Sequence, residues 1–334
     1  NSGGNIGTII SNTNNGGNNT ITNSGTIAKL EVKNGNTSGG NGGTINYIGD
    51  GIVTEEISVA GGATLSIAGG AGTITLDSNT GSKLNLLQDS IFQGSLKNAG
   101  SISTWNNVSN IDGSFINANG ASVGVLTAGS IANNLLNEGN ITTLTINKNI
   151  GTLTNDSNGI INTLTIQNGS NIANGITNDG NGIINSLTIQ NNSIITNGIT
   201  NDSNIGSLNL QENVTYNGSG SITNALDIAN NNTLTANNGI KILFANGATG
   251  TINNAGIISG NLTNTTNSTI KSFNTGSISG NLTNDARATI ETLNVDSNVG
   301  SIANSGNINT LNVTGNVANG ITNNASSTIT TLTI

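Results

Sequence analysis

The ten residues GIINTLTIQN, at positions 159–168, return almost unchanged as GIINSLTIQN at positions 182–191. The six residues NGITND follow each copy, at 174–179 and 197–202. Apolar and polar residues alternate in the centre of each copy, which is typical of a β-strand with one buried face. The Asn and Gly residues that flank each run favour tight turns. The repeated segment therefore predicts short strands joined by turns.

The same spacing extends well beyond this pair. A triplet of the form I-T-N or L-T-N, or a matching Asn, recurs along the chain, and its Asn falls at Asn155, Asn178, Asn201, Asn224, Asn264, Asn284, Asn304 and Asn323. A fixed period of 20–23 residues with strand signals and without helix signals indicates a solenoid. Stacked coils place like residues on like residues, so we expect these Asn side chains to form a structural ladder of hydrogen bonds.

Composition favours the same architecture. The 334 residues include 68 Asn and 47 Gly, no Pro, and only 2% aromatic residues, which suits a narrow core filled by Ile, Leu and Val. Pro would remove a hydrogen-bond donor from a stacked sheet. We predict an all-β fold, a parallel β-helix with about 20–23 residues per coil and roughly 15 coils.

The regularity of the pattern varies along one continuous solenoid. Residues 1–50 predict Asn/Gly-rich coils, and residues 51–90 predict tight coils with Ala/Gly turns. Residues 91–127 have weaker periodicity and predict an irregular coil or a loop. Regular repeats are expected over 128–334, with a local distortion near Phe244, where the Asn spacing is interrupted.

Charge and residue usage limit the function classes. The net charge is −8 and no cluster of Lys or Arg occurs, so nucleic-acid binding is not expected. No Cys is present, and no run reaches the roughly 18 apolar residues of a membrane helix. The chain starts without a signal-peptide pattern and stops within a repeat, so we expect it to be a fragment of a larger exported protein.

No catalytic centre is predicted. His and Cys are absent, which excludes imidazole bases and thiol nucleophiles. Glu55 and Glu56 are the close acidic pair, but adjacent residues of a strand point to opposite faces. The single Arg, Arg287, stands near Asp285 in a turn. We therefore expect a protein that is not an enzyme and holds no cofactor.

Three groups of residues remain as candidates for binding. Asp156, Asp179 and Asp202 recur at one corner and are weak candidates for calcium ligation, with ordinary turn formation as the alternative. Trp105, together with Phe92 and Phe115, offers possible aromatic interaction sites.

Outward hydroxyl groups form the third set of candidates. Thr-x-Thr pairs recur at Thr143/Thr145, Thr163/Thr165 and Thr331/Thr333, as on ice-binding solenoids, although Thr is also a good strand former on a wet face. Asn140 lies in Glu138-Gly139-Asn140-Ile141-Thr142, which matches an acidic glycosylation sequon and can equally arise by chance in this composition.

The turn sequence ITNSGTI at 21–27 and the recurring ITN and LTN triplets resemble passenger domains of Gram-negative (type V) autotransporters, of the Asn/Gly-rich adhesin or vacuolating-cytotoxin-like type. The resemblance implies a right-handed β-helix, display at the bacterial outer membrane or secretion, and tethering by a C-terminal β-barrel that this chain does not include. The protease motif G-D-S-G of one branch of that family is missing.

These observations predict a non-enzymatic adhesin or self-associating stalk. The expected partner is a host-cell receptor or glycan, or another copy of the chain, because many weak contacts on a repetitive face add up to avidity. A polysaccharide-acting enzyme and an ice-binding solenoid remain as alternatives; the first needs converging carboxylates, and the second needs a continuous planar Thr face.

Overall fold

A computed structural model describes residues 4–13, 17–34, 43–60, 63–67, 73–76, 83–86, 91–106, 110–245 and 250–334. The described chain is all-β and contains no helix in these ranges. Its strands are parallel and stack as a β-solenoid of about 14 turns, which confirms the predicted fold class. The predicted right-handed winding stays a prediction.

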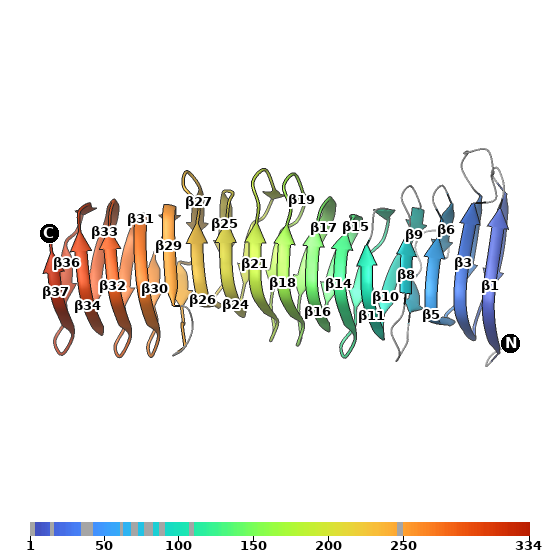
Figure 1. Cartoon of the computed structure of the whole chain (residues 1–334), viewed down its shortest axis with the longest axis horizontal. Coiled ribbons are helices and arrows are strands. Elements are labelled where there is room, and N and C mark those ends of the chain that lie inside the picture. The colour runs from blue at the N-terminus through green and yellow to red at the C-terminus, as the bar shows by residue number, and fades with distance from the viewer. Residues whose placement is uncertain are drawn as a thin grey trace. The chain divides into compact units, whose positions relative to one another are not determined.

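The chain forms two compact units, Asn1–Gly175 and Ile176–Ile334, called unit 1 and unit 2 below. Within each unit, the strands of successive coils lie side by side (Figure 1). The strands of unit 1 are β1 (Asn5–Thr13), β2 (Asn18–Thr22), β3 (Thr26–Asn34), β4 (Thr44–Ile48), β5 (Ile52–Val59), β6 (Thr64–Ile67), β7 (Thr73–Leu76), β8 (Lys83–Leu86), β9 (Ile91–Gln93), β10 (Ser95–Asn98), β11 (Ser101–Asn106), β12 (Asn110–Ile111), β13 (Phe115–Asn117), β14 (Ser122–Ala128), β15 (Ser130–Asn137), β16 (Asn140–Ile146), β17 (Asn149–Asn155), β18 (Ile160–Ile166) and β19 (Asn171–Ile172).

Unit 2 continues the numbering. Its strands are β20 (Ile176–Asn178), β21 (Ile183–Ile189), β22 (Ile194–Ile195), β23 (Ile199–Asn201), β24 (Asn204–Leu210), β25 (Val214–Asn217), β26 (Ser221–Ile228), β27 (Thr233–Ala236), β28 (Ile240–Ile242), β29 (Thr251–Ser259), β30 (Leu262–Asn264), β31 (Thr269–Asn284), β32 (Thr289–Val295), β33 (Asn298–Asn304), β34 (Asn307–Val313), β35 (Asn316–Val317), β36 (Ile321–Asn323) and β37 (Thr328–Thr333).

Register places equivalent residues of successive coils on top of one another. In unit 1, Leu126 of β14 pairs with Leu144 of β16, which pairs with Leu164 of β18. All three side chains are fully buried. The outward residues between them are polar or half-exposed, so the alternation of the sequence becomes a thin apolar core with a wet surface.

The longer strands bend at a corner. In β16 the burial pattern has two successive outward residues, Thr142 and Thr143, between the inward Ile141 and Leu144. At the equivalent corner of β24 stands Gly206, where an added Cβ would lie 2.2 Å from the carbonyl oxygen of Asn185. A side chain cannot fit there because the preceding coil is too close, so glycine permits the close stacking of the two corners.

The coils formed by residues 51–90 differ from the tight coils that the sequence predicts. Glu56 pairs with Lys83 and Thr64 pairs with Ile91, so these coils are longer than the predicted 20–23 residues. Short strands on different faces replace one long strand: β7 stacks on the first half of β5, and β8 stacks on the second half.

A break in the pattern also occurs near Phe244. The first residues of β26 pair with β28, whereas its last four residues pair with β29. Extra chain is therefore inserted between β28 and β29, and the Phe244 side chain is fully buried there. The local distortion predicted at this position is present.

Candidate functional site

Buried Asn side chains form hydrogen-bonded ladders inside both units. In unit 1, the side-chain amide nitrogen Nδ2 of each Asn donates to the side-chain oxygen Oδ1 of the Asn in the next coil, at 2.8 Å in each step, along Asn98, Asn117, Asn137 and Asn155. These Asn residues are 0% exposed. The amide of Asn137 also donates to the carbonyl of Gly139 in its own turn and to that of Ile160 in the following coil. Asn137 thus closes its own turn and links it to the next coil.

Unit 2 contains two further ladders. One runs from Asn178 to Asn201 and ends on the hydroxyl of Tyr216, with donor–acceptor distances of 2.7 and 2.8 Å. The other follows the same direction over Asn264, Asn284, Asn304 and Asn323. A buried amide needs its hydrogen bonds satisfied, so these side chains hold the coils in register.

The structure places most of the predicted Asn residues in these ladders, with one exception. Asn224 lies at a bulge of β26, where the register with β24 shifts, and its amide donates to the hydroxyl of Ser207 at 2.8 Å. Tyr216 instead receives the hydrogen bond from Asn201. Asn224 therefore differs from the prediction because the bulge turns it to the outward side of the corner.

The sequence pattern did not predict several of the ladder residues. Asn98, Asn117 and Asn137 lack the I-T-N triplet, but each is the last residue of a strand and follows a buried Leu or Phe by two positions. This simpler pattern, apolar-x-Asn before a turn, was a signal that could have found them. Asn23 occupies a comparable place, and its amide donates to the hydroxyl of Tyr47 at 2.7 Å.

The two Tyr residues therefore share one role. Tyr47 and Tyr216 are both fully buried, and each hydroxyl accepts a hydrogen bond from a ladder Asn. Burial raises the pKa of Tyr47 and raises the pKa of Tyr216 to about 12, because a phenolate would be poorly solvated in the core.

The aromatic residues suggested as interaction sites lie in the core. Trp105, Phe92 and Phe115 are all 0% exposed, and the rings of Trp105 and Phe115 pack 4.7 Å apart at 50°. This location differs from the predicted exposed surface, since the rings contact the protein interior. They therefore form part of the core of unit 1.

Two of the acidic candidates close their own turns, and the third, Asp202, accepts from a later residue. The carboxylate of Asp156 accepts from the backbone of Ser157, and that of Asp179 accepts from Gly180. Asp202 accepts from the backbone and the hydroxyl of Ser219. Among the described residues, no group of three or more acidic, His or Cys side chains could hold a metal ion.

Other predicted residues are at the surface. Glu55 forms an exposed ion pair with Lys29 at 3.9 Å, and Glu56 is half-buried beside it. Asn140 is exposed at the start of β16. In unit 1, Thr143/Thr145 pair in register with Thr163/Thr165, while the preceding coil has Val125 in the first of these columns.

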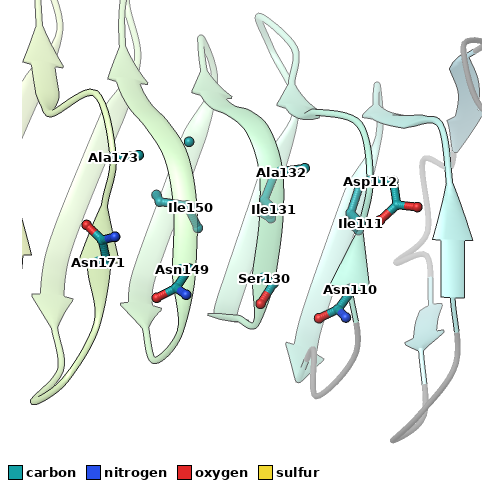
Figure 2. A pocket seen from close by; sticks show the side chains of 11 residues that line it. Asn110, Ile111, Asp112, Ser130, Ile131, Ala132, Asn149, Ile150, Asn171 and Ala173 are labelled. Atoms are coloured by element: carbon teal, nitrogen blue, oxygen red, sulfur yellow. The ribbon is translucent and has the colours of Figure 1, made fainter.

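A shallow groove crosses several coils of unit 1 (Figure 2). It has a volume of about 300 Å³. Asn110, Ser130, Asn149 and Asn171 lie in one row along its side, next to a second row of Asp112, Ala132, Gly151 and Ala173. The Oδ1 atom of Asn171 is buried and has no partner among the described residues. The groove offers amide groups beside a small apolar floor, with the carboxylate of Asp112 and the hydroxyl of Ser130 in its lining.

A continuous polar surface lies on unit 2. Two outward columns, one of Ser or Thr and one of Asn, run in register over four coils at Thr251/Asn253, Ser272/Asn274, Thr292/Asn294 and Thr310/Asn312. We call these eight residues the hydroxyl–amide face. The residues between the two columns point inward and are fully buried, so the columns stand on a rigid sheet.

Hydrogen bonds also link the Asn column of this face. Asn274 donates to Asn253 at 3.3 Å, Asn294 to Asn274 at 2.7 Å, and Asn312 to Asn294 at 2.9 Å. The column ends where Asn253 donates to the carboxylate of Asp227 at 2.9 Å. These contacts fix the amides in one orientation, which gives the face a regular array of donors and acceptors.

Two opposite charges border the face. Lys271 and Glu291 precede Ser272 and Thr292, so they occupy equivalent corner positions on adjacent coils. Both residues are exposed, and no ion pair involves either of them within the described part of the chain.

Comparison with family models, with curated proteins and with solved structures finds no match to this chain. The described residues also contain no helix long and apolar enough to span a membrane. The autotransporter resemblance therefore stays a prediction from the sequence.

Proposed function

We propose that this chain is a non-enzymatic, self-associating module of a bacterial surface protein, similar to an autotransporter passenger and displayed outside the cell or secreted. The single observation that supports this is the hydroxyl–amide face of unit 2. Each coil adds one hydroxyl and one oriented amide, so a partner with the same repeat can bind through many weak hydrogen bonds whose effects accumulate.

The partner that fits this face is a second copy of the same face. Consider a two-fold axis that relates the two copies, runs parallel to the strands and lies midway between β31 and β32. Each residue of one copy then faces a residue of the other copy that has the same position along the strand but belongs to the neighbouring coil. The axis therefore sets Ser272 against Thr292 and Asn274 against Asn294 of the other copy. Donor and acceptor groups are present on both sides, which makes the contact self-complementary.

Charge complementarity supports the same pairing. The two-fold axis that exchanges the coils sets Lys271 of one copy opposite Glu291 of the other, twice per pair. Opposite charges across an interface favour one arrangement over others and speed association, whereas like charges oppose it. The absence of an internal partner among the described residues leaves both side chains available for this contact.

Charge exchange tests the proposal. Lys271→Glu and Glu291→Lys each place like charges in contact across the interface, and we expect either one to weaken association by roughly tenfold. The double variant carrying both changes restores opposite charges and should recover the wild-type association. Sedimentation velocity of the purified chain and clumping of cells that display it provide the readouts.

A matched control changes the same charge elsewhere. Lys148→Glu alters an exposed residue in a turn of unit 1, outside the face, and should leave association unchanged. Circular dichroism verifies that each variant is folded. A wild-type chain that stays monomeric at high concentration, or single variants that associate like the wild type, would contradict the proposal.

A further inference from the structure

The Asn119-Gly120 pair of unit 1 combines chemical reactivity with an open environment. Asn119 and Gly120 form the tip of the turn between β13 and β14, and both residues are exposed. The turn is closed behind them by a hydrogen bond from the backbone of Ala121 to the carbonyl of Ala118 at 3.0 Å. Gly120 has φ +80°, and an added Cβ there would meet nothing within 4 Å.

We propose that Asn119 is a site of spontaneous deamidation, which converts this neutral turn into an acidic one. The backbone nitrogen of Gly120 loses its proton and attacks the side-chain carbon Cγ of Asn119. A nitrogen–carbon bond forms, the bond from Cγ to the amide nitrogen breaks, and ammonia leaves. Solvent water then opens the five-membered succinimide to Asp or isoaspartate, so the net change is amide plus water to carboxylic acid plus ammonia.

The reaction needs a free backbone N–H and a side chain able to turn. Within the described structure, neither the Asn119 side chain nor the Gly120 N–H forms a hydrogen bond. The missing Cβ of glycine leaves the attacking nitrogen unhindered. Exposed turn tips are also the places where the backbone moves most easily.

The structure protects two other Asn-Gly pairs of the chain from this reaction. In Asn158-Gly159, the Gly159 N–H donates to the carbonyl of Asp156 at 2.8 Å, and the glycine is buried. A Cβ at Gly159 would lie 2.4 Å from the carbonyl oxygen of Asn137, so the backbone is held against the preceding coil. In Asn181-Gly182, the Gly182 N–H donates to Asp179 in the same way. In these pairs the hydrogen bond must open before the nitrogen can attack.

Incubation of the folded chain at mildly alkaline pH, followed by proteolysis and mass spectrometry, tests the proposal. We expect the peptide with Asn119 to convert to Asp and isoaspartate at least roughly tenfold faster than the peptide with Asn158, because breaking the protecting hydrogen bond slows the latter. Asn119→Gln, whose longer side chain disfavours ring closure, should remove the early product while leaving the rates at other sites unchanged.

The same incubation in denaturant provides the matched control. Unfolding removes the protecting contacts, so Asn119 and Asn158 should then convert at similar rates. Equal rates at the two sites in the folded protein would overturn the proposal. A rate difference that persists in denaturant would also overturn it, because local sequence and not the fold would then set the order.

Discussion

Over residues 253–323, unit 2 carries an inner and an outer Asn ladder with similar coil spacing, and their environments differ. The inner ladder consists of Asn264, Asn284, Asn304 and Asn323. The outer ladder consists of Asn253, Asn274, Asn294 and Asn312. Asn264, Asn284 and Asn304 are at most 1% exposed, whereas the outer residues are half-exposed or exposed. We therefore expect burial, and not the hydrogen bond alone, to decide how much an Asn ladder contributes to stability.

Loss of an inner Asn should lower the free energy of unfolding the most. Asn284 accepts from Asn264 at 2.7 Å and donates to Asn304 at 2.8 Å. Asn284→Ala removes these bonds and those from its amide to the carbonyls of Ala288 and Asn307, so we expect it to lower the free energy of unfolding by about 3 kcal/mol. Denaturant unfolding measures this, and a loss below about 1 kcal/mol would contradict the importance of burial.

Removing the Tyr216 hydroxyl at the end of an inner ladder should lower the free energy of unfolding by an intermediate amount that depends on pH. Tyr216→Phe removes the acceptor of Asn201, and at neutral pH we expect a loss of about 1 kcal/mol. The pKa of Tyr216 is raised from 10.0 to about 12, so the folded state holds the proton more tightly than the unfolded state. The resulting stability is complete below pH 10.0 and is lost as the pH rises through about 12.

The difference between wild type and Tyr216→Phe isolates this contribution from other alkaline effects. Unfolding curves at several pH values should show the wild type losing more stability than the variant across this window. Parallel losses in both proteins would mean that Tyr216 does not titrate in the folded state as its burial requires.

Loss of an outer Asn should lower the free energy of unfolding the least. Asn294→Ala removes the two hydrogen bonds that link this residue to its ladder neighbours, from Asn312 and to Asn274, and within the described chain Asn294 makes no bond like those of Asn284 to backbone carbonyls. Water can satisfy the remaining groups at this surface, so we expect a loss of only about 0.5 kcal/mol. The same denaturant series checks this value. An effect equal to that of Asn284→Ala would remove the distinction between the two ladders.

The sequence predicts the fold class well because the repeat itself encodes the stacking. Alternation around Leu164 sets which residues point inward, and a recurring Asn sets where each coil turns. Asn224 shows the limit of this reasoning, since it matches the triplet and the spacing, but a bulge of β26 moves it out of the ladder. A bulge depends on how two coils pair, and the triplet alone does not encode that pairing.

The candidate site was less accessible to sequence reasoning. The sequence shows the Thr-x-Thr pairs, but it does not show that Thr292/Asn294 and Thr310/Asn312 stack in the same columns. Register reveals that these pairs form the continuous columns of the hydroxyl–amide face. The location of the aromatic residues was also predicted wrongly, because Trp105 is buried beside Phe115, and sequence alone could not tell a core position from an exposed platform.

The direction of hydrogen bonding in the two ladders of unit 2 has an electrostatic consequence. Inner amides donate toward the C-terminal coils, as from Asn264 to Asn284, whereas outer amides donate toward the N-terminal coils, as from Asn274 to Asn253. Each aligned row of amides is a row of dipoles, and a single row would build up a net dipole with every added coil. The two rows oppose each other, so the repeat can lengthen without accumulating the field that its side chains would otherwise create.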